Sequence, residues 1–214
     1  DLAFLSVFEW SSVYATTWNK LMNSTTKPLV TAGPDAHENV IPSNARDGER
    51  VDSYRRLMRW FSNHYLVSSM DRTGLKAAML ARRGWIVFEA LGSPVNFDFN
   101  MVIGSTTYNV GDDTQSWVSG TKLNVALPTL STSSPQEGMS PRQTLYLKKM
   151  STSGTETTVA SAVNQSISYT VPAAGVFRAE VWITPHHLLG FMGYLRNRLI
   201  KDYPWIVTNA IYLN

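Results

Sequence analysis

The 214-residue chain contains no cysteine, and only 16% of its residues are charged. The absence of cysteine excludes disulfides, thiolate metal ligands and a cysteine nucleophile. The 19 basic and 16 acidic side chains leave a net charge of 19 − 16 = +3, which does not favour nucleic-acid binding. No run of about 18 apolar residues occurs, so we expect no membrane span. Glycine-rich phosphate loops, Gly-x-Ser-x-Gly elbows and Ser-His-Asp arrangements are also missing from the sequence.

Residues 1–92 read as an α/β part, because short apolar runs alternate with helical patterns. The expected strands cover residues 3–9, 29–33 and 85–90, and the expected helices cover residues 17–22, 47–67 and 74–83. Thr73 is the expected N-cap of the last helix, and Gly84 is expected to end it. Strand–helix–strand alternation predicts a parallel sheet, but three strands are too few to close a barrel.

Residues 93–214 read as an all-β part, because the composition becomes rich in Ser, Thr, Val and Gly after Pro94. Short alternating runs separated by turn clusters predict an antiparallel β-sandwich. The expected inward-facing residues are Phe97, Phe99, Tyr108, Val110, Leu123, Val125, Leu127, Leu145, Leu147, Ile167, Tyr169, Val171, Phe177 and Val181. A late helix is expected from Thr184-Pro185 to Lys201, followed by a terminal strand over residues 205–213.

The stretch from residue 29 to residue 39 is the most informative for chemistry. A short apolar run reaches Gly33-Pro34 and is followed by Asp35-Ala36-His37. Side chains two residues apart in an extended chain share a face, so Asp35 and His37 are expected to project together. A carboxylate and an imidazole make half of a site for a Zn- or Mn-like ion. A solvated loop with a capping Asp is the alternative interpretation.

The neighbouring segments resemble the closing part of the PHP (polymerase and histidinol phosphatase) metal-dependent phosphoesterase family. The segments that carry this resemblance are residues 35–39, 47–50, 53–61 and 80–92. Residues 175–182 and 203–213 look like the tail of large bacterial members, although Asn209-Ala210 stands where Asn-Pro is expected. The resemblance covers nearly the whole chain, but only Asp35-x-His37 carries chemistry.

The resemblance implies a distorted (β/α) barrel that binds up to three divalent ions such as Zn, Mn or Fe. Asp35 matches a metal ligand of the family, and His37 matches a ligand that is also catalytic, beside the scissile phosphate. The implied reaction is attack of metal-activated water on a phosphomonoester or phosphodiester substrate. The fold it predicts is a partial PHP-type (β/α) barrel over residues 1–92, followed by a β-sandwich-like accessory domain over residues 93–214.

The earlier His-rich motifs of the family are not in this sequence. Residues 1–8 read as a buried strand that begins abruptly and lacks signal-peptide features. We therefore expect the chain to be the C-terminal part of a longer protein, with the N-terminal remainder of that protein as its partner and no activity alone. The resemblance leans towards a periplasmic or extracellular location.

Other candidate residues favour structural interpretations. His64 is expected to pack on a helix face, and His186-His187 to lie in the first turn of the late helix. Glu38 and Asn39 either orient His37 or are solvated loop residues. Asp112-Asp113 either caps its own turn or binds Ca²⁺.

The basic cluster Arg55, Arg56 and Arg59 is expected to form the polar face of a helix. Most of the tryptophans are core candidates, although exposed ones on a sandwich could stack on sugars. Two other functions stay open. One is a non-catalytic glycan- or protein-binding module with a vestigial barrel, and the other is ester or carbamate hydrolysis on the same scaffold.

Overall fold

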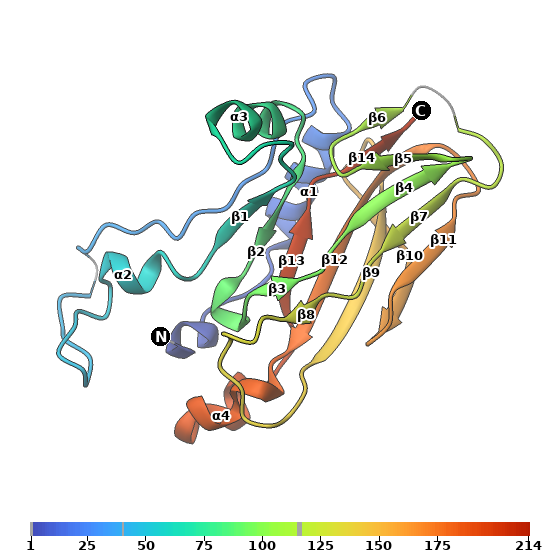
Figure 1. Cartoon of the computed structure of the whole chain (residues 1–214). Helices are drawn as coiled ribbons and strands as arrows, with labels where there is room; N and C mark the ends of the chain where they lie inside the picture. Colours follow the sequence, from blue (N-terminus) through green and yellow to red (C-terminus); the bar gives the residue numbers. More distant parts are fainter. Residues whose placement is uncertain (1, 40, 115–116) are drawn as a thin grey trace.

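The computed structural model describes residues 2–39, 41–114 and 117–214, which form two packed β-sheets with short helices around them (Figure 1). The larger sheet has eight strands: β1 Ser62–Tyr65, β2 Gly84–Val87, β6 Asp113–Thr114, β9 Arg142–Met150, β10 Glu156–Val163, β12 Gly175–Thr184, β13 Tyr203–Thr208 and β14 Ile211–Leu213. Its strands run β10-β9-β12-β13-β2-β1, with β14 beside the start of β12 and β6 beside β14. All of these pairings are antiparallel except that of β14 with β6.

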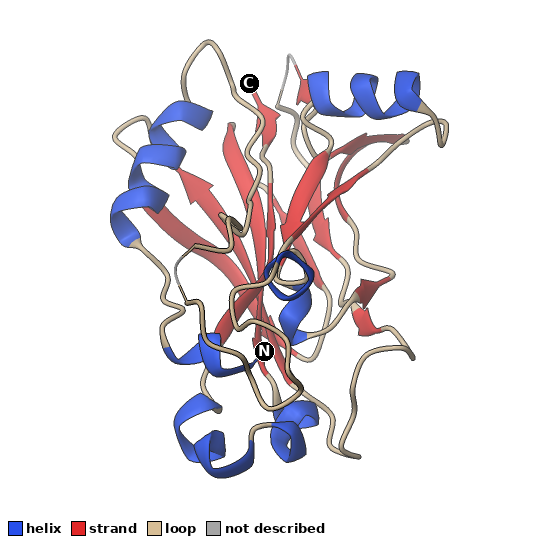
Figure 2. Ribbon diagram, turned by 90° about the vertical axis from the view of Figure 1, so that its left-hand side faces the viewer, coloured by secondary structure: helices blue, strands red, loops and turns tan. Residues whose placement is uncertain are grey.

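The smaller sheet has four antiparallel strands in the order β11-β7-β4-β5. These strands are β4 Phe99–Ile103, β5 Thr106–Asn109, β7 Lys122–Val125 and β11 Ile167–Thr170. A separate ribbon pairs β3 Pro94–Val95 with β8 Thr129–Leu130. Figure 2 shows the strands in the middle of the molecule and the helices around them.

The core lies between the two sheets and confirms the predicted inward faces. Every residue expected from strand alternation is buried in this core or packs against it. On β12, Phe177, Ala179 and Val181 point into the core, and the alternate side chains point to the other face of the sheet. The antiparallel, sheet-rich architecture expected for residues 93–214 is therefore present.

The first part of the chain differs from the predicted parallel alternation. Residues 2–6 form a 3₁₀ helix, Leu2–Ser6, in place of the strand expected over residues 3–9. Residues 29–33 form no strand, although they lie in an extended run of chain. The helix expected over residues 47–67 is replaced by the short helix α2, Tyr54–Leu57, and by strand β1. Among the described residues before Gly92, the strands β1 and β2 are antiparallel to each other, and a parallel barrel sheet is not observed.

Two helices of this part were expected at nearly their observed places. Helix α1, Ser12–Met22, includes the expected residues 17–22, and its N-cap Ser11 accepts a hydrogen bond from the backbone NH of Tyr14. Helix α3, Arg72–Leu80, is capped by Asp71 and not by Thr73. The helix ends before the expected stop at Gly84, because Arg82, just after the C-cap, has a left-handed backbone conformation with φ +59°. The strand expected over residues 85–90 is β2, followed by a 3₁₀ helix, Glu89–Leu91.

The late helix and terminal strand are each interrupted. Residues 184–201 form two 3₁₀ helices, His186–Phe191 and Gly193–Leu195, and the helix α4, Arg196–Leu199. Gly193 has φ +54°, which a continuous α-helix does not allow. The strand expected over residues 205–213 is divided into β13 and β14 at Asn209-Ala210.

The predicted division between residues 92 and 93 stays a prediction, but contacts run across it. Strand β2 pairs with β13, so the larger sheet takes strands from both sides of the division. The described helices include none with the length and apolarity needed to cross a bilayer.

Candidate functional site

Two asparagine side chains hold the chain that leads to Asp35. Asn209 accepts a hydrogen bond from the backbone NH of Val30 at 2.9 Å and donates to its carbonyl at 3.3 Å. Asn63, on β1, does the same for Ala32, at 3.0 and 2.9 Å. Val30 and Ala32 are two residues apart, so their backbone groups point the same way in an extended chain. The side-chain amides of Asn209 and Asn63 therefore make the hydrogen bonds that a neighbouring strand would make. The predicted strand over residues 29–33 is thus an extended chain paired to side chains.

Asp35 and His37 converge at the end of this segment. The Nε2 atom of His37 lies 2.9 Å from Oδ1 of Asp35, and both side chains are exposed. The expected cause of this convergence was wrong: Asp35 has φ +51°, in the left-handed region, so the motif is a turn and not the end of a strand. The carboxylate and the imidazole are nevertheless within hydrogen-bond distance, as a shared site requires.

Asn39 occupies the other nitrogen of the imidazole. Its Oδ1 atom lies 2.8 Å from Nδ1 of His37. The pKa of His37 is raised above 6.5 by this hydrogen bond first, and then by the hydrogen bond and the charge of Asp35. Of the two interpretations of the residues after the motif, orientation of His37 therefore describes Asn39.

We expect the pKa of His37, measured by NMR titration of its ring protons, to lie above 6.5. The Asn39→Ala substitution should lower this pKa, and Asn39→Asp, which places a carboxylate at the same position, should raise it further. Because the folded-state pKa is raised, the stabilisation is complete below pH 6.5 and is lost as the pH rises through the folded-state pKa. A His37 pKa that is the same in all three proteins would contradict the assigned hydrogen bond.

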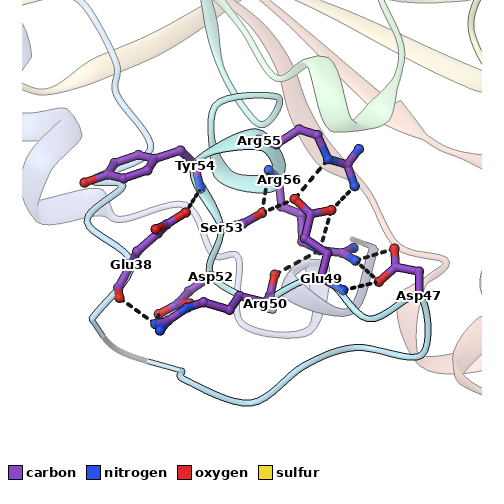
Figure 3. Close-up of polar contacts among 9 residues, drawn as sticks. All are labelled: Glu38, Asp47, Glu49, Arg50, Asp52, Ser53, Tyr54, Arg55 and Arg56. Carbon is purple, nitrogen blue, oxygen red and sulfur yellow. Dashed lines mark hydrogen bonds and ion pairs between the residues drawn. The ribbon is translucent and has the colours of Figure 1, made fainter.

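Glu38 binds the loop that follows the motif (Figure 3). Its Oε1 atom accepts a hydrogen bond from the backbone NH of Tyr54 at 2.9 Å, at the start of α2. Its carbonyl oxygen accepts a hydrogen bond from Arg50, which also forms a two-point ion pair with the buried Asp52. The Oδ2 atom of Asp52 in turn accepts a hydrogen bond from the backbone NH of Ile41 at 2.7 Å. These contacts hold both ends of the loop that connects His37 to α2.

The basic residues of α2 bind carboxylates of the same loop. Arg55 pairs with Glu49, and Arg56 pairs with Asp47 at 2.5 Å (Figure 3). The side chain of Arg56 is largely buried, so this guanidinium is part of the loop structure. The helix that carries Arg55 and Arg56 has only four residues, and Arg59 lies outside it, so the helix face expected for these arginines is shorter than predicted.

His64 lies on strand β1, not on a helix, and binds Glu89. Its Nε2 atom is 2.9 Å from Oε1 of Glu89, whose carboxylate also accepts hydrogen bonds from Ser62 and Ser93 at 2.5 Å. Burial alone would raise the pKa of Glu89, but the hydrogen bonds from His64, Ser62 and Ser93 outweigh it, and the net shift is downward. Ser62 and His64 donate to the same carboxylate, so they do not form the serine–histidine relay of a hydrolase triad.

Two other candidate ligands, His187 and Asp112, bind neighbouring groups of the chain. Nε2 of the fully buried His187 lies 2.9 Å from the carbonyl oxygen of Leu91, and burial lowers its pKa below 6.5. Asp112 accepts a hydrogen bond from the backbone NH of Asn109 and binds Arg83, which is the turn-capping arrangement expected as one alternative.

The metal site predicted from Asp35 and His37 is incomplete in these residues. Within residues 2–39, 41–114 and 117–214, the structure contains no group of three or more His, Asp and Glu side chains arranged to hold a metal ion. Comparisons of the chain with protein-family models, with curated proteins and with solved structures give no match.

Proposed function

We propose that Asp35 and His37 supply two ligands to a divalent metal site in a PHP-type phosphoesterase. The observation that carries this proposal is the 2.9 Å approach of the Asp35 carboxylate to Nε2 of His37 on the exposed side of the molecule. Carboxylate oxygen and imidazole nitrogen are both ligands of Zn, Mn and Fe ions. A bound ion would replace the contact that the two groups make with each other in the free site.

The surroundings of the pair suit this role. The Asn39 amide oxygen accepts Nδ1–H of His37, which leaves Nε2 available for a ligand and fixes the tautomer. The Asn63 and Asn209 side chains hold the chain before the motif, and Glu38 and Arg50 hold the chain after it. A divalent ion bound here would supply an activated water and would compensate charge on the phosphoryl oxygens. His37 would lie beside the scissile phosphate of a monoester or diester.

The remaining ligands must come from outside the residues described here. Two protein ligands are fewer than the three that catalytic sites usually provide. The proposal therefore includes further ligands from an N-terminal remainder of the same protein, which would also contribute the other strands of a PHP-type barrel. The 214 residues alone would then bind metal weakly and be inactive.

The test compares metal content and phosphodiester hydrolysis in the protein that carries the remaining ligands. The substitutions Asp35→Ala and His37→Ala should each remove bound Zn or Mn and lower turnover by roughly 100-fold or more, since even residues that only orient a ligand contribute roughly 10- to 100-fold. Glu38→Gln is the matched control, because it removes the neighbouring charge and keeps an acceptor for the Tyr54 NH. Equal metal content and equal turnover in all of these proteins would refute the proposal.

A further inference from the structure

A hollow lies on the face of the larger sheet that is turned away from the core. On β12, the side chains that alternate with the core residues are Arg178, Glu180 and Trp182. On β9, Tyr146 stands opposite Glu180, and Lys148 stands opposite Arg178. These two strands line a hollow of about 380 Å³, which is large enough for a small ligand.

Three aromatic rings form the apolar wall of this hollow. The ring of Trp182 lies 6.0 Å from that of Trp10 at an angle of 61°, and 6.5 Å from that of Tyr146 at an angle of 89°. All three residues are partly exposed. The indole NH of Trp182 donates to Glu180 at 2.7 Å, which fixes the orientation of the central ring. The hollow therefore offers aromatic surface whose central ring, Trp182, is held in place by a hydrogen bond.

The charged groups of the hollow are paired with one another. Lys148 lies 3.2 Å from Glu156, and Asp202 lies 3.6 Å from Arg142. The fully buried Arg178, beneath the hollow, binds both Glu156 and Glu180. Three acidic and three basic side chains thus balance, so these groups leave no excess charge that would favour an ionic ligand.

Hydrogen-bonding capacity remains beside the aromatic rings. The bond from Lys148 to Glu156 uses one of three ammonium hydrogens, whereas Glu180 is 2% exposed and already accepts a bond on each oxygen. Burial alone would raise the pKa of Glu156, but the charge of Arg178, the Asn19 hydrogen bond and Lys148 outweigh it. The net shift is downward, so Glu156 is an ionised acceptor at neutral pH.

The alternatives to a neutral polar ligand fit less well. A cation would be repelled by the ammonium of Lys148, which already lies 5.3 Å from the centre of the Tyr146 ring. The centroids of the Trp10 and Tyr146 rings also lie only 6.0 and 6.5 Å from that of Trp182, so an ammonium group does not fit between the rings. An apolar ligand would remove water from the partly exposed Glu156 and Lys148 without replacing the lost hydrogen bonds.

We propose that this hollow binds a neutral sugar residue of a glycan. The C–H face of the sugar ring would pack on Trp10 or Trp182, and its hydroxyl groups would bond to the partly exposed Glu156 and Lys148. Because the site lies among groups that are held by Arg178 and Asn19, little ordering is needed on binding. The proposal does not depend on the metal site, and it assigns a recognition role to the sandwich.

The experiment titrates the 214-residue chain with cellohexaose, xylohexaose, maltohexaose, mannohexaose and chitohexaose, followed by calorimetry and tryptophan fluorescence. At least one of these neutral oligosaccharides should bind, and Trp182→Ala should weaken that binding by roughly tenfold or more. Trp182→Phe keeps an aromatic face and should retain most of the affinity, which separates loss of stacking from loss of folding. Tyr194→Ala is the control, because that aromatic side chain is 92% exposed.

Three results would overturn the proposal. One is no binding of any oligosaccharide by the folded wild-type chain. Another is tighter binding of tetramethylammonium than of any neutral sugar, which would indicate a cation site. The third is sugar binding that Trp182→Ala leaves unchanged, because the ligand would then lie elsewhere.

Discussion

Replacing Arg178 with methionine is expected to lower the free energy of unfolding by about 3–5 kcal/mol. The Arg178 side chain is fully buried and binds the carboxylates of Glu180 and Glu156. Its Nε atom donates to Asn19, and its guanidinium lies 4.9 Å from the centre of the Trp18 ring. Methionine would preserve part of the packing but would leave Glu180, which is 2% exposed, without a cation.

The controls separate the lost charge pair from lost packing. The double variant Arg178→Met/Glu180→Gln should recover part of the stability, because it removes the uncompensated buried carboxylate. Lys148→Met removes a more exposed cation that binds the same Glu156, and it should cost less than about 1 kcal/mol. Urea unfolding at pH 7 measures all three. An Arg178→Met protein within about 1 kcal/mol of the wild type would contradict the buried ion cluster.

The same cluster should weaken in acid. The pKa of Glu156 is lowered from its usual 4.5, so its ionic contribution is present above pH 4.5 and is lost as the pH falls through the folded-state pKa. The stability difference between the wild type and Arg178→Met should therefore decrease as the pH falls below 4.5.

The alternation of the second part of the chain was sufficient to predict its core. Phe177 and Val181 lie four residues apart on β12, on the same face of the strand, and both are buried between the sheets. The same pattern could not predict that Arg178 and Glu180, on the other face, are also buried. Local alternation identifies the two faces of a strand, but it does not show which face a distant helix covers. Here Arg178 on β12 binds Asn19 on α1, which is 159 positions away in the sequence.

The first part was harder to predict because short apolar runs fit more than one structure. Helical spacing is shown by Leu57, Trp60, Phe61 and His64. Residues 62–65 nevertheless form a strand that pairs with β2, and His64 stands opposite Trp85 in this pairing. The extended chain at Val30 was recognisable, but its partner Asn209 is 179 positions away. Residues 205–213 were expected to form one strand, and only the structure shows that the strand is divided at Asn209-Ala210 and that the Asn209 side-chain amide binds the chain before Asp35.

The sequence predicted that Asp35 and His37 lie close together, but it did not predict the backbone geometry that brings them together. Asp35 and His37 come together through a turn with positive φ, and sequence spacing alone cannot distinguish that turn from an extended strand. The contact from Asn39 was one of two interpretations, and the structure selects it. His64 and Glu89 were not predicted as partners, because only the register of β1 and β2 brings these elements together.

Replacing Trp205 with alanine is expected to lower the free energy of unfolding by about 3–5 kcal/mol. Trp205 lies on β13 and is 1% exposed. Its indole NH donates to the carbonyl of Gly92 at 2.7 Å, and its own carbonyl accepts a hydrogen bond from the NH of Phe88 at 2.8 Å. This residue therefore joins the terminal strand to the chain immediately before the predicted domain division.

Unfolding of this variant also tests whether residues 1–92 and 93–214 are one cooperative unit. Trp205→Phe keeps most of the packing and leaves the Gly92 carbonyl without its indole donor, so it should cost about 1–3 kcal/mol. Tyr194→Ala, at an exposed position, should change stability by less than about 0.5 kcal/mol. Because β2 pairs with β13, circular dichroism and tryptophan fluorescence should report one coincident transition in the wild type, shifted as a whole in Trp205→Ala. Two separate transitions, only one of them shifted, would instead show that the strands on either side of residue 92 unfold independently.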